Sequence, residues 1–391
     1  MKSTHSKKIT VFVAMSGGVD SSVAALLLKK QGYDVTGVYM KNWSEESFAG
    51  KFAKSCPWKN DLSDVKKVCK ALDIPCVVYN FEKEYNRLVI DPFFEGERLG
   101  KTPNPDVVCN REIKFGLFLK RARADGADYI ATGHYARVRV KQQNSTPHSA
   151  SSHPLRSRRG IKGEVASNGA RITYQLLQAK DKNKDQTYFL CLLTQKQLSK
   201  TLFPIGDYTK PQIRLLAKKY KLTTAEKPES MGICFVGEVK LDEFLKFRIK
   251  PKPGPILNTD GEIIGEHKGL PFYTLGQRRG LEIGGAGLPW FVVSKNKKNN
   301  SIVAAPGNNN PRLFKKTISI GPINWITPSP RPTSLKCQVR IRHRGELAAA
   351  TIKFRNRPNV FFHHPQRAIT PGQYCAIYKN GVLLGGGEIQ S

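Results

Sequence analysis

Apolar strand-like runs and helical stretches alternate along the first third of the chain. The first run, Ile9–Met15, is followed by apolar positions at helical spacing that stop at Gly32, a residue suited to a helix C-terminus. The stretches Val65–Leu72 and Asn110–Ala124 have the same helical spacing. Three more strand-like runs lie at Val35–Met40, Cys76–Phe81 and Tyr129–Thr132. This alternation predicts an α/β domain with a doubly wound, mostly parallel sheet and helices on both faces.

The periodic pattern is then interrupted. From Lys141 to Arg171 the chain is polar and poor in aromatic residues, a composition typical of a flexible insertion. Helical spacing returns at Lys210–Tyr220, where Thr209 can cap the helix and Pro211 suits its first turn. The stretch Pro251–Pro255 indicates a domain edge.

The remaining third has the pattern of short antiparallel strands. Asp260–Gly261 and Asn380–Gly381 each predict a hairpin turn, and Cys337–Arg342 alternates with basic residues at the outward positions. A small antiparallel β-barrel is the predicted fold. We therefore divide the chain into the α/β domain (1–238), a small central domain (239–308) and a C-terminal β-barrel (309–391).

Length and hydropathy limit the class of protein. The 391 residues suffice for two or three domains with cores of their own. No apolar run approaches the ~20 residues of a membrane-spanning helix. Met1–Lys8 is basic but lacks the apolar stretch of a signal peptide, so we expect a cytoplasmic protein with no membrane partner.

The charge is strongly basic and unevenly distributed. The formal net charge is +33, and after Pro311 thirteen Lys and Arg residues face only Glu346 and Glu388. Such a surface favours a polyanionic partner, so we expect nucleic acid. A lysine-rich surface that merely confers solubility is the alternative, and charge alone does not separate RNA from DNA.

The eight cysteines contain no C-x-x-C pair, so no zinc knuckle or thioredoxin-like motif is predicted. In an expected cytoplasmic protein most should be buried as small apolar residues, Cys191 and Cys375 among them. Cys56, Cys69 and Cys76 are irregularly spaced, which favours a structural role.

The first candidate site is the glycine-rich segment Ser16–Ser22, between the first strand and its helix. Gly17 and Gly18 allow close approach to the backbone, and the helix N-terminus adds a positive dipole, so the segment suits a phosphate. No lysine follows, which excludes the Walker-type loop. A tight turn before an ordinary helix is the alternative. Met40 and Gly133 also lie at predicted strand ends, where ligands of such sheets bind.

Two cysteine segments are the next candidates. Cys109 precedes a predicted helix start at Asn110, which would favour its thiolate, and Asp106 could exchange protons beside it. A core cysteine near a capping aspartate is an equally good interpretation. Cys234 lies between two glycines. It is interpreted either as a buried strand residue or as a reactive thiol on a mobile loop, because glycines permit unusual backbone geometry.

Taken together, these segments resemble the tRNA-specific 2-thiouridylases of the ATP pyrophosphatase (PP-loop) superfamily. The matching pieces, in the family's order, are A-M-S-G-G-V-D-S-S, T-P-N-P-D-x-x-C-N-x-E-I-K-F, A-T-G-H-Y-A-R, K-D-Q-x-Y-F-L, G-I-C-F-x-G-E and L-G-Q-R-R-G-L. They run from Ala14 to Leu281, and the Lys141–Arg171 insertion is the part that departs from the family's compact pattern.

The resemblance implies binding residues in three groups. ATP would be bound by Ala14, Met15, Ser16, Gly17, Gly18, Val19, Asp20, Ser21, Met40 and Gly133, with Asp20 near Mg²⁺ and pyrophosphate. The target base would be met by Asn104, Pro105 and Asp106. Contacts to tRNA would come from His134, Lys184, Asp185, Gln186, Arg342, His343 and Gln373.

The resemblance also implies the reaction. The C2 oxygen of the wobble uridine would be adenylated by ATP, and sulfur would come from a persulfide on Cys234, with AMP and pyrophosphate released. Cys109 would be the nucleophile and Asp106 the acid/base. In one route the persulfide sulfur would attack C2 directly. In the other, Cys109 would attack the persulfide, which frees sulfide and leaves a Cys109–Cys234 disulfide.

Further expectations concern cofactors and partners. Since Asp106 stands where related thiolases use a cysteine, we expect no iron–sulfur cluster. We expect a monomer that binds the anticodon region of tRNA and receives sulfur from a relay protein or a cysteine desulfurase. Two alternatives are an ATP pyrophosphatase-type ligase that needs neither cysteine, and a non-catalytic RNA-binding protein with a vestigial ATP fold.

Overall fold

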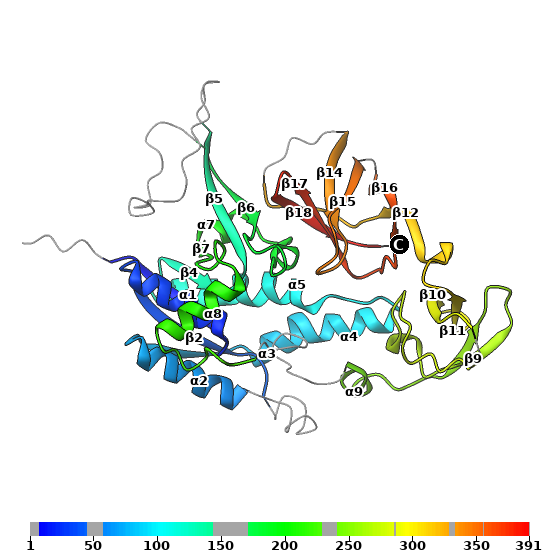
Figure 1. The fold of residues 1–391 in the computed structure, drawn as a ribbon, viewed down its shortest axis with the longest axis horizontal. Coiled ribbons are helices and arrows are strands. Elements are labelled where there is room, and N and C mark those ends of the chain that lie inside the picture. Colours follow the sequence, from blue (N-terminus) through cyan, green and yellow to red (C-terminus); the bar gives the residue numbers. More distant parts are fainter. Residues whose placement is uncertain are drawn as a thin grey trace, which may run out of the picture.

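The computed structural model describes residues 8–44, 58–143, 171–228, 241–284, 287–327, 333–354 and 356–390. Figure 1 shows the α/β part at one end of the molecule, a small β-rich part at the other end, and the C-terminal strands above the helices that lie between.

The N-terminal sheet has five strands. They are β1 (Thr10–Met15), β2 (Asp34–Lys41), β3 (Cys76–Asn80), β4 (Tyr129–Thr132) and β7 (Thr201–Leu202). Their order is β3-β2-β1-β4-β7, and every neighbouring pair is parallel. The predicted parallel sheet is therefore confirmed.

Helices cover both faces of this sheet. Along β1, Val11, Val13 and Met15 belong to one hydrophobic cluster, while Phe12 and Ala14 belong to another. The first cluster includes residues of α1 (Val19–Lys30), α2 (Trp58–Ala71) and α8 (Lys210–Lys219). The second includes residues of α3 (Glu82–Tyr85), α4 (Asp91–Arg98), α5 (Pro105–Cys109), α6 (Phe118–Ala124), α7 (Gln195–Ser199) and α9 (Leu241–Lys246). Because side chains alternate across a strand, this division confirms the doubly wound arrangement.

One helix begins earlier than predicted. Helical backbone runs from Pro105, through a π-helical stretch over Asn110–Leu117, to the end of α6. Pro105 suits the first turn, and the Asn104 side chain caps it by accepting a hydrogen bond from the backbone of Val107 (3.2 Å). The predicted start at Asn110 is therefore wrong, and Cys109 lies more than one turn inside the helix. Cys109 therefore lies too far from the helix N-terminus for the helix dipole to favour its thiolate.

The central part is a four-stranded sheet. Its strands are β8 (Gly254–Leu257), β9 (Ile263–His267), β10 (Trp290–Asn296) and β11 (Ser301–Pro306), in the order β10-β11-β8-β9. The antiparallel β8–β9 pair confirms the hairpin predicted at Asp260–Gly261, where Gly261 has φ +93°.

The C-terminal strands are antiparallel, as predicted. They are β12 (Phe314–Ser319), β13 (Asn324–Trp325), β14 (Ser334–Arg340), β15 (Ala348–Phe354), β16 (Pro358–Arg367), β17 (Tyr374–Lys379) and β18 (Val382–Glu388). Asn380 and Gly381 both have positive φ (50° and 74°) between β17 and β18, which confirms the second hairpin.

This sheet extends into the first part of the chain. β18 pairs with β6 (Arg171–Gln178), and β6 pairs with β5 (Ala136–Gln143). The predicted insertion Lys141–Arg171 thus joins two paired strands; Lys141–Gln143 and Arg171 belong to the strands, and the rest lies outside the described residues. The β5–β6 hairpin connects the α/β domain to the C-terminal sheet.

Among the described residues, no helix is both long enough and apolar enough to cross a membrane.

Candidate active site

The glycine-rich loop is held in shape by its own hydroxyl groups. Ser21 Oγ accepts a hydrogen bond from the backbone N–H of Ser16 (3.2 Å) and donates one to the carbonyl of Gly18 (3.1 Å). Ser22 Oγ donates to the same carbonyl (2.9 Å). The hydroxyls therefore stabilise the loop itself, and backbone N–H groups are its main donors for a phosphate.

Glycine is required at two positions around the loop. Gly17 has φ +74°, and a Cβ there would lie 2.8 Å from the carbonyl oxygen of Asp61. A Cβ on Gly133, which follows β4, would lie 2.7 Å from the backbone nitrogen of Ser21. The structure thus brings Gly133 against the loop, as expected for ends of neighbouring parallel strands. Met40 is buried near the end of β2.

A lysine and a tyrosine that sequence reasoning missed bind the loop's carboxylate. Lys210 Nζ lies 2.8 Å from both carboxylate oxygens of Asp20, and the Tyr135 hydroxyl donates to Oδ1 (2.9 Å). The Lys210 side chain is 11% exposed and that of Asp20 is 31% exposed. Tyr135 belongs to the A-T-G-H-Y-A-R motif, which was a usable signal, whereas Lys210 stands 190 positions from Asp20 and had none.

At this loop Asp20 offers a partly exposed carboxylate to a Mg²⁺ ion. Among the described residues no group of three or more His, Cys, Asp or Glu side chains is placed to hold a metal. Magnesium in nucleotide sites commonly uses one or two carboxylates plus substrate phosphates, so Asp20 fits such an ion.

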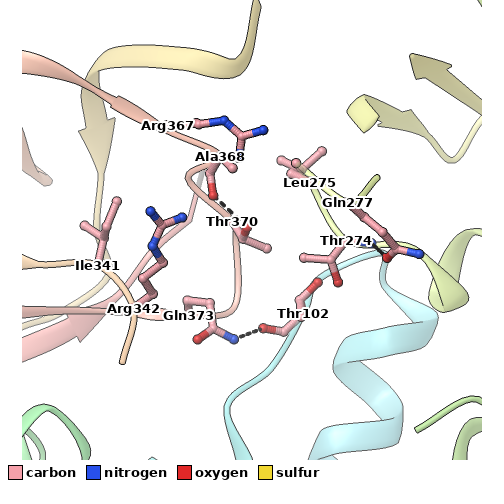
Figure 2. Close-up of a pocket in the computed structure, with 11 residues that line it drawn as sticks. Thr102, Thr274, Leu275, Gln277, Ile341, Arg342, Arg367, Ala368, Thr370 and Gln373 are labelled. Atoms are coloured by element: carbon pink, nitrogen blue, oxygen red, sulfur yellow. Dashed lines mark hydrogen bonds between the residues drawn. The ribbon is translucent and has the colours of Figure 1, made fainter. Parts of the chain in front are cut away.

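The predicted target-base segment lies against the C-terminal sheet. Asn104 Nδ2 donates to Gln373 Oε1 (3.1 Å), and Gln373 Nε2 donates to the carbonyl of Thr102 (2.8 Å; Figure 2). The Tyr188 hydroxyl donates to the same Gln373 oxygen (3.4 Å). A predicted base-binding residue and a predicted tRNA-binding residue, 269 positions apart, are therefore in direct contact.

The predicted nucleophile Cys109 is buried. It is 1% exposed and belongs to the hydrophobic cluster that contains Phe94 and Phe244, while Asp106, one turn earlier, is partly exposed. Access to the thiol therefore requires the surrounding chain to open.

The predicted persulfide carrier Cys234, and with it the Cys109–Cys234 disulfide, lies outside the described residues, which stop at Pro228 and resume at Leu241. The described residues on both sides of this gap make specific contacts. Lys227 Nζ donates to carboxylate oxygens of Asp61 and Asp64 (both 2.7 Å), and Asp61 is the residue that Gly17 faces. On the other flank, the Phe244 ring packs on Phe94 in the same cluster as Cys109, with ring centroids 5.2 Å apart.

Two predicted tRNA contacts, His134 and Asp185, are buried, and Gln186 is partly exposed. Burial, and then the charge of Lys114, holds the pKa of His134 well below its usual value, so its imidazole is neutral at pH 7. Gln186 Oε1 accepts from the backbone N–H of Tyr135 (2.9 Å). The Asp185 side chain is 0% exposed and accepts from Arg340 Nη1 (2.8 Å).

The other predicted contacts lie nearer the surface. Arg342 is exposed and Lys184 is partly exposed. The His343 ring stacks on Phe189, with centroids 4.4 Å apart. Burial, followed by the charges of Arg344 and Arg340, lowers the pKa of His343 to about 4.

Comparison with known proteins decides the family. Three family models match: a tRNA methyl transferase HUP domain over residues 9–238, a tRNA methyl transferase PRC-barrel domain over 242–306, and an aminomethyltransferase beta-barrel domain over 315–389. A tRNA-specific 2-thiouridylase MnmA from Oceanobacillus iheyensis is 44% identical over 389 residues, covering 99% of this chain and 96% of the relative. The chain belongs to the tRNA-specific 2-thiouridylase family.

Other members of the family are equally similar. The 2-thiouridylase MnmA 1 of Geobacillus kaustophilus is 45% identical over 97% of this chain and 95% of its own length, and that of Legionella pneumophila is 44% identical over 98% and 99%. The resemblance inferred from six motifs is thereby confirmed, together with the predicted α/β-plus-barrel fold. The exact domain boundaries and the individual site residues stay predictions.

Proposed function

We propose that this chain catalyses the ATP-dependent 2-thiolation of the wobble uridine of tRNA. Membership of the 2-thiouridylase family over almost the whole chain is the observation that carries the proposal. The site supports it, because direct contacts join the Asn104–Cys109 segment to Gln373, beside the basic C-terminal sheet. Gly133 packs against the phosphate loop.

ATP would activate the uracil C2 oxygen, which is otherwise a poor leaving group. The loop N–H groups and the N-terminus of α1 would bind the phosphates, with Asp20 holding Mg²⁺ and Lys210 close by. Magnesium would supply positive charge to the departing pyrophosphate. The oxygen attacks the α-phosphorus, the bond to pyrophosphate breaks, and AMP becomes the leaving group at C2.

Sulfur would then replace AMP. In one route the terminal sulfur of the Cys234 persulfide attacks C2, AMP leaves, and the Cys109 thiolate attacks Cys234 Sγ to release the thiolated base. In the other, Cys109 attacks first and frees sulfide, which attacks C2. Both routes leave a Cys109–Cys234 disulfide, which an external dithiol must reduce. Asp106, one turn before Cys109, would transfer the protons.

We propose that the persulfide comes from a sulfur-relay protein or a cysteine desulfurase, since no step above makes it. A cytoplasmic monomer that binds the anticodon region is the proposed working form. An iron–sulfur cluster is not part of the proposed mechanism, because Asp106 stands at the position of the ligating cysteine; iron analysis of protein purified without oxygen tests this.

The deciding experiment incubates the protein with ATP, Mg²⁺, a persulfide donor and unmodified tRNA. Thiouridine is then measured by mass spectrometry. Cys109→Ser and Cys234→Ser should each abolish the product, whereas the matched control Cys337→Ser, at a partly exposed cysteine on β14, should keep it. Full thiolation by both variants would exclude the mechanism. A ligase that forms an amide would be insensitive to either change.

A further inference from the structure

A pocket of about 320 Å³ lies where the three parts of the chain meet. Thr102 precedes the target-base segment, Thr274 and Gln277 come from the L-G-Q-R-R-G-L motif, and Arg342 and Arg367 come from the C-terminal sheet region. Figure 2 shows Thr102, Thr274 and Gln277 on one side of the pocket, Arg342 on the other, and Arg367 across its end.

The lining carries hydrogen-bond donors that lack acceptors. The Nη2 atom of Arg367 and the hydroxyl of Thr102 are buried and have no hydrogen-bond partner among the described residues. Arg342 is exposed, and its guanidinium makes no hydrogen bond or ion pair with any residue that the structure describes. Buried donors without partners are costly, so they point to a ligand that accepts hydrogen bonds.

The charge of the lining is positive. Among the described residues that line the pocket are two arginines and no Asp or Glu. Arg367 is held in place by its Nε–H bond to the carbonyl of Asn308 (3.3 Å) and by the Phe291 ring, 5.0 Å from its guanidinium carbon. Burial, and then the charge of Arg342, lowers the pKa of Arg367, as expected of two like charges that face one another without a carboxylate. An anion between them would relieve this repulsion.

The family resemblance already assigns two residues of this pocket, Arg342 and Gln373, to tRNA contacts. We propose that Arg367 and Thr102 beside them bind a phosphate of the substrate RNA strand next to the target uridine. The inference rests on the proposed function. Thr102 and Gln373 belong both to this pocket and to the contact that fixes Asn104, so the pocket adjoins the proposed base site. Exposed Arg278 and Arg279 extend the basic surface from Gln277. The volume exceeds that of one phosphate, which leaves room for the attached ribose.

The first test measures the affinity of the full-length protein for unmodified tRNA at several salt concentrations. Arg367→Gln should weaken binding about tenfold and reduce the slope of log affinity against log salt by roughly 0.7. Thr102→Val should weaken binding severalfold without loss of stability, since it removes an unpartnered hydroxyl at nearly constant volume. The matched control Arg357→Gln, at an exposed arginine, should change affinity less than twofold.

The second test identifies the phosphate. Short anticodon stem-loop RNAs carry one uncharged methylphosphonate each, at successive positions around the target uridine. At one position the replacement should weaken binding to the wild-type protein and have little further effect on Arg367→Gln, which is the signature of a direct pair.

The outcomes separate the two proposals. If the wild-type protein fails to bind RNA, the proposed function fails and this inference with it. If it binds RNA while Arg367→Gln and Thr102→Val bind equally well, the phosphate pocket alone is refuted. Weaker binding of inorganic phosphate or ATP by Arg367→Gln, with RNA affinity unchanged, would assign the pocket to a free anion and also overturn the proposal.

Discussion

At the scale of single residues, the ion pair between Lys210 and Asp20 matters most for the proposed function. The Asp20 carboxylate is paired with Lys210 and bound by the Tyr135 hydroxyl. If Asp20 binds a metal ion, as proposed above, the Lys210 ammonium loses this partner and becomes available to the phosphates of ATP. We therefore propose that Lys210 exchanges Asp20 for a phosphate when ATP binds.

Lys210→Gln is therefore expected to weaken ATP and pyrophosphate binding by about tenfold or more, and AMP binding much less, because the lost charge lies at the loop. Isothermal titration calorimetry with the three ligands measures this. Lys218→Gln, on the same helix but paired with Glu226 at the surface, is the matched control. Unchanged ATP affinity in a folded Lys210→Gln protein would show that this lysine serves structure alone.

The lowered pKa of His343 predicts that the stability of the protein depends on pH. The folded pKa of about 4 lies below the usual 6.5, so between these values the unfolded chain binds more protons than the folded one. The stability contributed by the neutral ring is present above pH 6.5 and is lost as pH falls toward 4. The unfolding free energy, measured with urea, should fall between pH 7 and pH 5 in both proteins. The fall should be about 1 kcal/mol smaller in His343→Gln than in wild type, a value that allows for the partial exposure of the ring. His363 is exposed, so His363→Gln should show the same fall in unfolding free energy as wild type.

At the scale of elements, the ends of strands and helices place the chemistry. β1 and β4 are parallel, with Ala14 opposite Thr132, so the loop after β1 and Gly133 after β4 must meet. That meeting follows from a predicted parallel sheet. The start of α5 did not follow in the same way, because both Asn104 and Asn110 are good caps. Asn110 Nδ2 instead donates to the carbonyl of Phe189 (3.3 Å), a partner 79 positions away.

Gly133→Ala tests the meeting of strand end and loop. Its Cβ would come within 2.7 Å of Ser21 N and 2.8 Å of the carbonyl carbon of Asp20, so the backbone of the loop must shift. ATP affinity should fall at least about tenfold, with a stability loss of about 1–3 kcal/mol typical of overpacking. Calorimetry and thermal unfolding measure the two effects. Gly284→Ala, where a Cβ meets no described atom within 4 Å, should behave as wild type; an equal loss in both variants would contradict the steric explanation.

At the scale of the whole molecule, the α/β domain and the C-terminal sheet are joined by buried polar contacts. Asp185 pairs with Arg340 at 2.8 Å, and the Thr187 hydroxyl lies 3.1 Å from that of Tyr378. Asp185 also accepts from the backbone N–H of Ala179 (3.1 Å). A predicted tRNA contact is thus also a link between two parts of the chain, and its effect on RNA binding would come through the surface that it positions.

Asp185→Asn leaves Arg340 as a buried charge without its partner and should cost about 3 kcal/mol of unfolding free energy. Adding Arg340→Met should recover part of this loss, whereas Glu226→Gln, which breaks the exposed pair with Lys218, should cost less than about 1 kcal/mol. Urea unfolding of the four proteins is the measurement. If Asp185→Asn is as stable as wild type, the pair does not hold the domains together.

Local sequence by itself determined the first four strands of the parallel sheet, the hairpin turns at Asp260–Gly261 and Asn380–Gly381, and the glycine-rich loop. Side-chain periodicity and turn chemistry act over a few neighbouring residues, which is why these features could be predicted. The ordered motifs determined the family. Tertiary structure alone decided that Lys210 pairs with Asp20, that Gln373 contacts Asn104, and that Thr102 and Arg367 share a pocket. Such contacts join residues more than a hundred positions apart and depend on how whole elements pack, which no local pattern encodes.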